Sequence, residues 1–277
     1  MQIFKKIVIV LGYSILTAAL GAYFWFAGGL VKEKYSSIQL RRINIVITDS
    51  AVNRFVNREM ITNLLKLEGV SITETKLRHL NLFDIEKQLK FRYNIKRAEA
   101  SKNMRGELNI EVEQRRPLLR LECRDGGFYI DDEAYIFPLD TVYTADVPVV
   151  TGNIPLTLFA DFKGIVKENR EWADAIMKIG EHISREDLWN AMIEQIDIDS
   201  NGDLHFTPRV GKQDIIFGPA DNIEEKFTKL SAFYNDIAPD KGWEKYSEIN
   251  LKFDGQIVCK LNKSFVKQND TIKRAEN

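Results

Sequence analysis

The feature that most constrains this chain is a run of 25 residues without a charged side chain, from Ile7 to Val31. Two lysines precede the run and another follows it. An α-helix rises about 1.5 Å per residue, so a helix of this length exceeds the hydrocarbon core of a bilayer, which is roughly 30 Å thick. The sequence therefore predicts a transmembrane helix over residues 7–31.

The alternative for this run is a cleaved signal peptide, whose apolar part usually has about 7 to 15 residues and ends in small residues. Ala19 and Gly21 could form such an end, but the run continues through the aromatic residues 23–26. Aromatic rings of this kind suit a membrane interface, and we favour a retained span. Residues 1–6 are then expected in the cytoplasm, and the long region after the span is expected outside it.

The charge balance bounds the classes of partner. The chain has 39 Lys and Arg against 40 Asp and Glu. Nucleic-acid binding needs a basic face, so we expect no nucleic-acid partner. An apolar content of 44% over 277 residues is enough for two modest domains with cores of their own.

Residues 32–115 have the pattern of one small β-α-α-β-β domain. Alternating isoleucines within residues 43–47 predict the first strand, and alternating apolar residues within 107–114 predict the last. Between them, Asn57 and Asn81 are expected to cap two short helices. The apolar positions on the predicted helix faces are Ile61, Leu64, Leu65 and Leu67, then Leu82, Ile85 and Leu89.

Residues 116–262 consist of short strand-like runs and turns, which predict a mostly antiparallel β domain. Two helices are expected within it. Their apolar stripes are Trp172, Ile176, Ile179 and Ile183, then Ile223, Phe227, Leu230 and Tyr234. The fold class is therefore α+β, with a transmembrane helix in front and a polar tail, residues 263–277, at the end.

The stretch "GGFYIDDEAYIFPL", residues 126–139, resembles a site because acids and aromatic residues crowd together in it. Consecutive strand residues point to opposite faces and Asp is common in turns, so a solvated turn over Asp131, Asp132 and Glu133 is favoured over a catalytic pair of carboxylates. The stretch predicts a β-hairpin.

A second stretch, "DIDSNGDLH", matches the opening of an EF-hand calcium loop through Asp197, Asp199 and Asn201. Pro208 stands where that loop needs a bidentate Glu, so we favour a hairpin that turns at Asn201 and Gly202 and expect no metal site. The histidines, His79, His182 and His205, are far apart in sequence, and each is expected to be exposed and isolated. Cys123 and Cys259 each end an alternating run; buried free thiols are favoured over a disulfide.

The order of these features resembles the bacterial cell-division family FtsQ/DivIB. The resemblance covers nearly the whole chain: one N-terminal span, a POTRA-like β-α-α-β-β module, the transition "IEVEQRRPLLRL", the hairpin "FYIDDEAYIFPL", then "VPVVTG", "TPRVG" and "INLKFDGQIVCKL". This chain has Ala134 where the family often has Gly. The turn there has either another geometry or an alanine with positive φ.

The resemblance implies a non-enzymatic scaffold in the inner membrane at the division septum, which binds FtsB and FtsL outside the cytoplasm and needs no cofactor or small-molecule substrate. In the family a basic residue followed by an aromatic residue near the C-terminus resembles the FtsB contact, and Lys252 and Phe253 match that pair. Alternation predicts that Leu251 and Phe253 share one face of the last hairpin. The expected partner-binding residues are Leu251, Lys252, Phe253, Gly255 and Ile257. Phe253 could instead be a core residue.

Two other classes stay open at this point. A binding module for secretion or outer-membrane assembly would also use a POTRA-like domain, though usually in tandem copies. An envelope enzyme acting on peptidoglycan would need a catalytic site, and the sequence shows none of the known nucleophile, zinc or phosphate-loop motifs.

Overall fold

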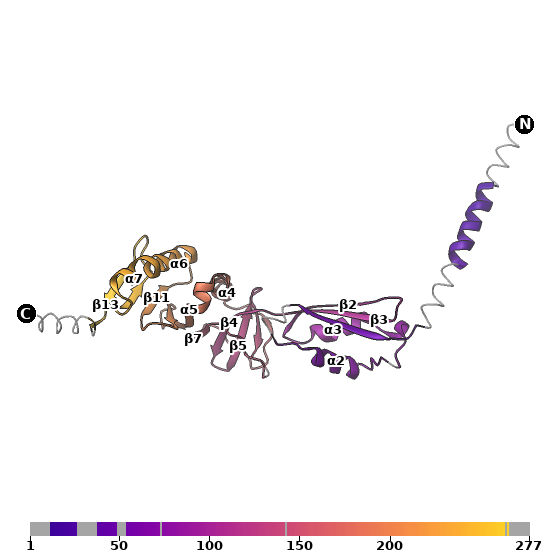
Figure 1. The fold of residues 1–277 in the computed structure, drawn as a ribbon, viewed down its shortest axis with the longest axis horizontal. Helices are drawn as coiled ribbons and strands as arrows, with labels where there is room; N and C mark the ends of the chain where they lie inside the picture. The colour runs from indigo at the N-terminus through magenta and orange to yellow at the C-terminus, as the bar shows by residue number, and fades with distance from the viewer. Residues whose placement is uncertain are drawn as a thin grey trace, which may run out of the picture. The chain divides into compact units, whose positions relative to one another are not determined.

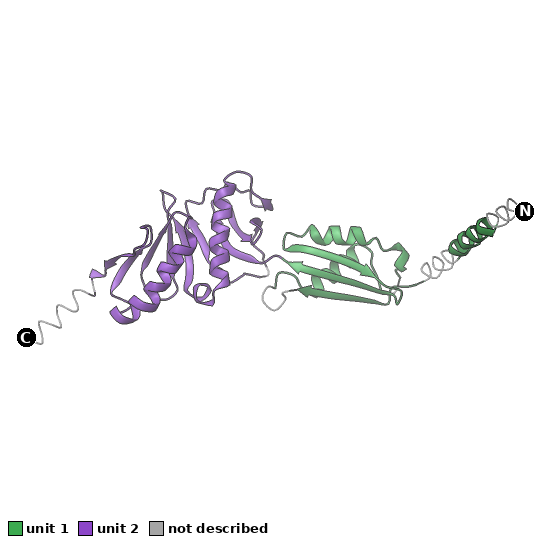
Figure 2. Cartoon of the chain, turned by 90° about the horizontal axis from the view of Figure 1, so that it is seen from above, with its two compact units in different colours: residues 1–114 green, residues 115–277 purple. Residues whose placement is uncertain are grey.

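A computed structural model describes residues 12–26, 38–48, 54–72, 74–141, 143–263 and 265. The chain divides into two compact units, unit 1 (residues 1–114) and unit 2 (residues 115–277), which are coloured separately in Figure 2. Each unit has its own sheet, so each is described by itself.

The N-terminal part of unit 1 includes a helix over residues 12–26. Among the residues that the structure describes, no helix is both long and apolar enough to cross a membrane. The span predicted over residues 7–31 extends beyond this helix at both ends, into residues outside the described ranges. Residues 1–6 and nearly all of the predicted tail, 263–277, also lie outside them.

The folded part of unit 1 has the β-α-α-β-β order predicted from the sequence (Figure 1). Its elements are β1 (Arg42–Thr48), α2 (Arg58–Leu67), the short 3₁₀ turn η1 (Leu77–His79), α3 (Leu82–Lys90), β2 (Ile95–Lys102) and β3 (Glu107–Gln114). The sheet order is β1-β3-β2, with β1 parallel and β2 antiparallel to β3. The first and last predicted strands are therefore neighbours.

Local sequence signals account for the helices of unit 1. The Asn57 side chain accepts a hydrogen bond from the Met60 N–H at 2.8 Å, as a helix cap should. Asn81 precedes α3, but its side chain donates to Asp84 at 2.5 Å instead of capping the backbone. The predicted apolar face is wrong at Leu67, the last residue of α2, which is 85% exposed because the buried face of the helix ends at Leu65.

Unit 2 is built on one ten-stranded sheet. Its strands are β4 (Pro117–Cys123), β5 (Gly126–Asp131), β6 (Tyr135–Pro138), β7 (Val149–Gly152), β8 (Gly164–Ile165), β9 (Ile193–Ile198), β10 (Leu204–Pro208), β11 (Asp214–Gly218), β12 (Tyr246–Asn250) and β13 (Val258–Leu261). They follow the order β13-β12-β11-β10-β9-β7-β4-β5-β6-β8. Three neighbouring pairs, β4 with β7, β7 with β9 and β11 with β12, are parallel and the others antiparallel.

Helices of unit 2 pack against this sheet and complete its core (Figure 2). They are α4 (Arg170–Arg185), α5 (Asp187–Met192), α6 (Ile223–Ala232), a π-helical turn η2 (Phe233–Ile237) and α7 (Ala238–Lys241). Both predicted apolar stripes face the core, with Trp172 and Ile223 only partly buried. Gly180 lets α4 approach β4, since a Cβ there would lie 2.7 Å from Leu119 Cγ.

The predicted hairpin over residues 126–139 is confirmed, with Phe128 opposite Pro138 and Ile130 opposite Ile136. Ala134 closes its turn at φ 54° and donates its N–H to the Asp131 carbonyl at 3.1 Å. The alternative of an alanine with positive φ is therefore the one adopted. The Ala134 side chain is fully buried in the core, so its methyl group adds apolar burial that glycine could not provide.

The two cysteines are free thiols, as predicted, but each is only partly buried. Both pack against the same core cluster, but Cys123 lies on β4 and Cys259 on β13, with five strands between them. Six strand spacings amount to roughly 29 Å along the sheet, whereas a disulfide needs Cα atoms within about 7 Å. Burial also raises the pKa of the Cys123 thiol to about 11.

Candidate partner-binding edge

The last two strands form the terminal hairpin that the sequence predicts. β12 pairs antiparallel with β13, with Ile249 opposite Cys259 and Asn250 opposite Val258. β12 also pairs with β11, whereas β13 stands at the end of the strand order. An edge strand carries backbone N–H and C=O groups that can pair with another chain. The expected partner-binding residues thus lie beside a sheet edge.

The connection between β12 and β13 buries one expected contact residue and exposes another. Leu251 is fully buried and donates its N–H to the Ile216 carbonyl at 2.9 Å, whereas Phe253 is 46% exposed. The prediction that these two side chains share a face is wrong, because β12 ends at Asn250 and the strand alternation ends with it. The Phe253 ring is consequently outside the core.

Lys252 is held by its own chain. Its ammonium group forms an ion pair with Asp203, in the loop between β9 and β10. Its aliphatic stem crosses Gly218, where a Cβ would lie 2.5 Å from Lys252 Cγ. In this structure the acidic neighbour of Lys252 is therefore Asp203.

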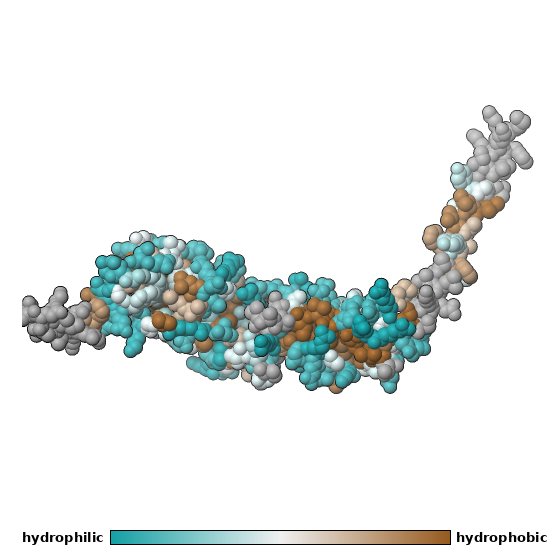
Figure 3. Space-filling view, in the orientation of Figure 1, coloured by the Kyte–Doolittle hydropathy of each residue, from teal (hydrophilic) through white to brown (hydrophobic). Residues whose placement is uncertain are grey.

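The remaining two expected residues shape the turn. Gly255 has φ 63°, a left-handed conformation that glycine adopts without strain. Ile257 is half-buried against the core cluster. On the face seen in Figure 3, hydrophobic side chains gather over unit 1, while hydrophilic ones cover most of unit 2. Within unit 2, Phe253, Val258 and Leu261 of the terminal hairpin are each exposed.

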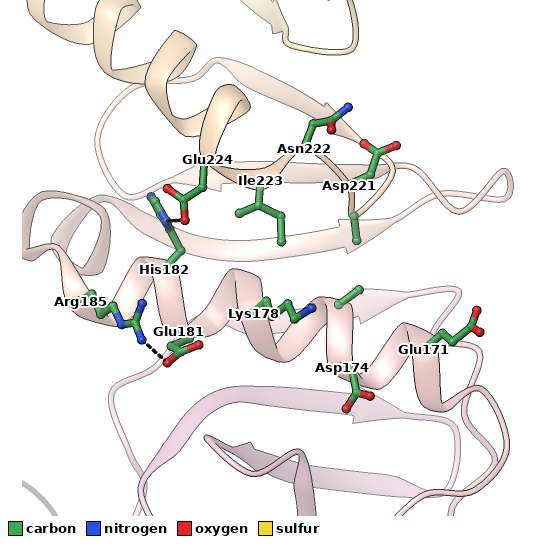
Figure 4. A pocket seen from close by; sticks show the side chains of 12 residues that line it. Glu171, Asp174, Lys178, Glu181, His182, Arg185, Asp221, Asn222, Ile223 and Glu224 are labelled. Atoms are coloured by element: carbon green, nitrogen blue, oxygen red, sulfur yellow. Dashed lines mark hydrogen bonds and ion pairs between the residues drawn. The ribbon is translucent and has the colours of Figure 1, made fainter.

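A groove of about 700 Å³ lies between α4 and the start of α6 (Figure 4). Its lining is mainly charged: Glu171, Asp174, Lys178, Glu181, His182, Arg185, Asp221 and Glu224, with Ala175, Ala220, Asn222 and Ile223. Arg185 pairs with Glu181 at 2.5 Å, and His182 Nδ1 lies 3.3 Å from Glu224. This lining offers paired charges but no hydroxyl or thiol nucleophile.

Asp131 corrects the expectation of a solvated turn. Its side chain is fully buried, and Oδ2 accepts a hydrogen bond from Arg115 at 2.6 Å. Oδ1 accepts from the N–H groups of Glu133 and Tyr135, each at 2.9 Å. Burial raises the pKa of Asp131 despite these donors. Asp132 and Glu133 are exposed as expected, and Glu133 Oε2 lies 3.6 Å from Arg115 Nη1.

The hairpin predicted for "DIDSNGDLH" is confirmed, with Ile198 opposite Leu204 and Ile196 opposite Phe206. Its loop is longer than a two-residue turn: the Asp199 N–H donates to the Asp203 carbonyl at 3.0 Å. Asp199 Oδ1 accepts the N–H groups of Asn201 and Asp203. Within the described ranges, no group of three or more His, Cys, Asp or Glu side chains is arranged to hold a metal ion.

The histidines are less isolated than expected. His79 is exposed but accepts a hydrogen bond from Arg78 Nε at 2.7 Å. The exposed-histidine reading is wrong for His182, which stacks on Phe227 with ring centroids 4.0 Å apart. It is also wrong for His205, which is partly buried and lies 3.1 Å from Asp214 on the neighbouring strand. The contacts of His182 and His205 cross between elements, so spacing along the chain could not reveal them.

Sequence reasoning missed the side chains that fix the terminal turn. Glu225 and Lys229, on α6, contact the backbone of residues 251–255. Their spacing of four residues marks an ion pair on a helix surface. Nothing in that spacing points to a loop more than twenty residues away.

Comparison with protein families agrees with this architecture. A family model described as FtsQ/DivIB, C-terminal related, matches residues 116–260, just over half of the chain. A model of a POTRA-like domain matches residues 39–113. No curated protein matches the chain. The family matches fall in units 2 and 1 and follow the order that the sequence resemblance predicts. The chain therefore belongs to the FtsQ/DivIB family.

Proposed function

We propose that this protein is a non-enzymatic scaffold of the bacterial cell-division machinery, and that its terminal hairpin binds FtsB and FtsL. The match to the FtsQ/DivIB C-terminal model over residues 116–260 carries the proposal, since this range contains the hairpin and the turn before β13. Membership of the family suggests a division-associated scaffold, and the exposed hairpin supplies a surface for that role.

The proposed contact uses strand addition. A partner strand pairs with the outer edge of β13, where main-chain hydrogen bonds provide affinity and neighbouring side chains provide selectivity. Phe253, 46% exposed at the start of this edge, acts as the aromatic anchor. Leu251, Gly255 and Ile257 shape the turn that presents it, and Lys252 exchanges Asp203 for an acidic side chain of the partner.

The proposed location is the inner membrane at the division septum. The uncharged run over residues 7–31 forms the single span, residues 1–6 stay in the cytoplasm, and residues 32–277 lie outside it. Within this region we assign residues 32–115 to the POTRA-like domain and 116–262 to the β domain.

Replacing the anchor tests the partner-binding role. Phe253→Ala in the full chain should weaken capture of the extracytoplasmic region of FtsB by about thirtyfold, because truncating an aromatic anchor typically costs about 2 kcal/mol. The melting temperature should stay within about 2 °C of the parent value, since the ring is outside the core. Binding to immobilised FtsB measures the affinity, and thermal unfolding measures the melting temperature.

The matched control is Phe159→Ala, which removes a phenylalanine ring that is 76% exposed on the same unit but outside the hairpin. It should bind FtsB like the parent. Unchanged binding by Phe253→Ala would contradict the proposed site. A tagged chain that localises away from the septum would favour a secretion or outer-membrane assembly module instead.

A further inference from the structure

Lys229 of α6 reaches across to the turn between β12 and β13. Its ammonium group donates to the carbonyl oxygens of Leu251 and Phe253 at 2.8 and 2.9 Å. The third acceptor is Glu225 Oε1 at 3.2 Å. An ammonium group has three donors, so these three acceptors satisfy it completely. The Lys229 side chain is 11% exposed, which sets it apart from an ordinary surface lysine.

Glu225, one helical turn before Lys229, holds the other end of the same turn. Its Oε1 accepts the Gly255 N–H at 3.2 Å. Gly255 lies between the end of β12 at Asn250 and the start of β13 at Val258, so this N–H is outside the β12–β13 ladder. Residues four apart lie side by side on a helix, and here the pair spans the turn from Leu251 to Gly255.

We propose that Glu225 and Lys229 are positioning residues: they form a clamp on α6 that fixes the backbone of residues 251–255 and thereby presents the Phe253 ring for docking. This inference rests on the proposed function and adds a second element, α6, to the docking site. Neither clamp residue needs to touch the partner.

The clamp acts by ordering the turn before the partner arrives. When a surface loop becomes ordered only on binding, the affinity for the partner is lower, because the loop's loss of conformational entropy opposes the free energy of binding. An exposed lysine–glutamate pair alone contributes little. Here the pair also makes three charge-assisted hydrogen bonds to backbone groups of the turn, which are about twice as strong as neutral ones.

Amide hydrogen exchange of the full chain in detergent, read by mass spectrometry, tests the clamp directly. Glu225→Met and Lys229→Met should speed exchange in residues 252–256 by about fivefold or more, since each loses at least one hydrogen bond worth about 1 kcal/mol. Glu224→Met is the matched control: it removes a neighbouring carboxylate that contacts His182 instead of the turn. It should leave this exchange unchanged.

The same variants are then compared in FtsB capture and in thermal unfolding. Lys229→Met should weaken capture by roughly tenfold while exchange in β9 and β10 stays at the parent rate. Unchanged exchange in residues 252–256, or faster exchange throughout unit 2, would overturn the clamp. If the clamp variants bind FtsB normally while Phe253→Ala does not, the positioning role of Glu225 and Lys229 is wrong and the proposed docking site stands.

If exchange in the turn becomes faster but no variant, Phe253→Ala included, changes FtsB capture, the clamp exists and the proposed function is wrong.

Discussion

Arg115 and Asp131 form a buried ion pair at the start of unit 2. We expect Asp131→Asn to lower the free energy of unfolding by about 2 kcal/mol, because it leaves the Arg115 guanidinium with the half-exposed Glu133 carboxylate, 3.6 Å away, in place of a buried ionised partner. The Arg115 side chain is 10% exposed, and its guanidinium lies 3.5 Å from the Tyr135 ring centre. Urea unfolding of the full chain, followed by tryptophan fluorescence, measures the change.

Asp125→Asn, an exposed change in the turn between β4 and β5, serves as the comparison for Asp131→Asn. It should alter the free energy of unfolding by less than about 0.5 kcal/mol. Equal stabilities for the two variants would show that the buried pair contributes nothing beyond a surface carboxylate.

At this scale the sequence predicts residues whose partners are near in the chain. Asn57 caps α2 through an N–H three residues away, which is a local pattern. Asp131 is different, because its partner Arg115 is sixteen residues away and arrives by strand pairing. In the sequence, a turn with three acidic residues reads the same whether one of the side chains is buried or all are exposed.

The turn between β12 and β13 has a pH response of its own. The Gly255 N–H, followed by Lys229, holds the pKa of Glu225 below its ordinary value of 4.5. A lowered pKa means that the ionised group stabilises the fold above the ordinary value and that this contribution is lost as the pH falls through the folded pKa. We therefore expect the clamp to release on acidification below pH 4.5.

The Gly255 amide chemical shift, followed by NMR during acid titration, should move with a midpoint below 4.5. Glu225→Gln should abolish this transition, while Glu224→Gln should keep it. A midpoint at or above the ordinary value would mean that the carboxylate does not accept the Gly255 hydrogen bond in solution.

Among elements, sequence periodicity locates helices and strands well where one face is buried. The stripes of α4 and α6 follow this rule. It fails for β5, where Tyr129 is buried as completely as its neighbours Phe128 and Ile130. Both faces of β5 are covered, so alternation carries no information there. It also fails after Asn250, where the strand becomes a turn.

For the whole molecule, the division at residue 114 predicts two independent folding units. Residues 38–114 and 115–263, produced separately, should each unfold cooperatively in scanning calorimetry, because each contains its own sheet and buried core. Absence of a cooperative transition in either piece would show that the intact chain is needed for that unit to fold.

The order of features along the chain identifies the family, but it does not give the strand order of unit 2. The parallel pair β7 and β9 is separated in sequence by α4 and α5, and β11 and β12 by α6 and α7. Alternation tells which residues face inward but not which strand is the neighbour. The distance between Cys123 and Cys259 follows from that strand order, so the sequence could not predict it either.

From β9 to β13 the strands stand side by side in the same succession as along the chain. A chain that folds as it is synthesised, from its N-terminus onward, can thus add these strands to the sheet one at a time, always at the same border. The border exposed by β13 comes into being only when residues 258–261 have been delivered. A partner that pairs with the edge of β13 would then bind only a chain that has been made as far as this strand. A shorter chain would end its sheet at β12, whose backbone groups differ from those of β13.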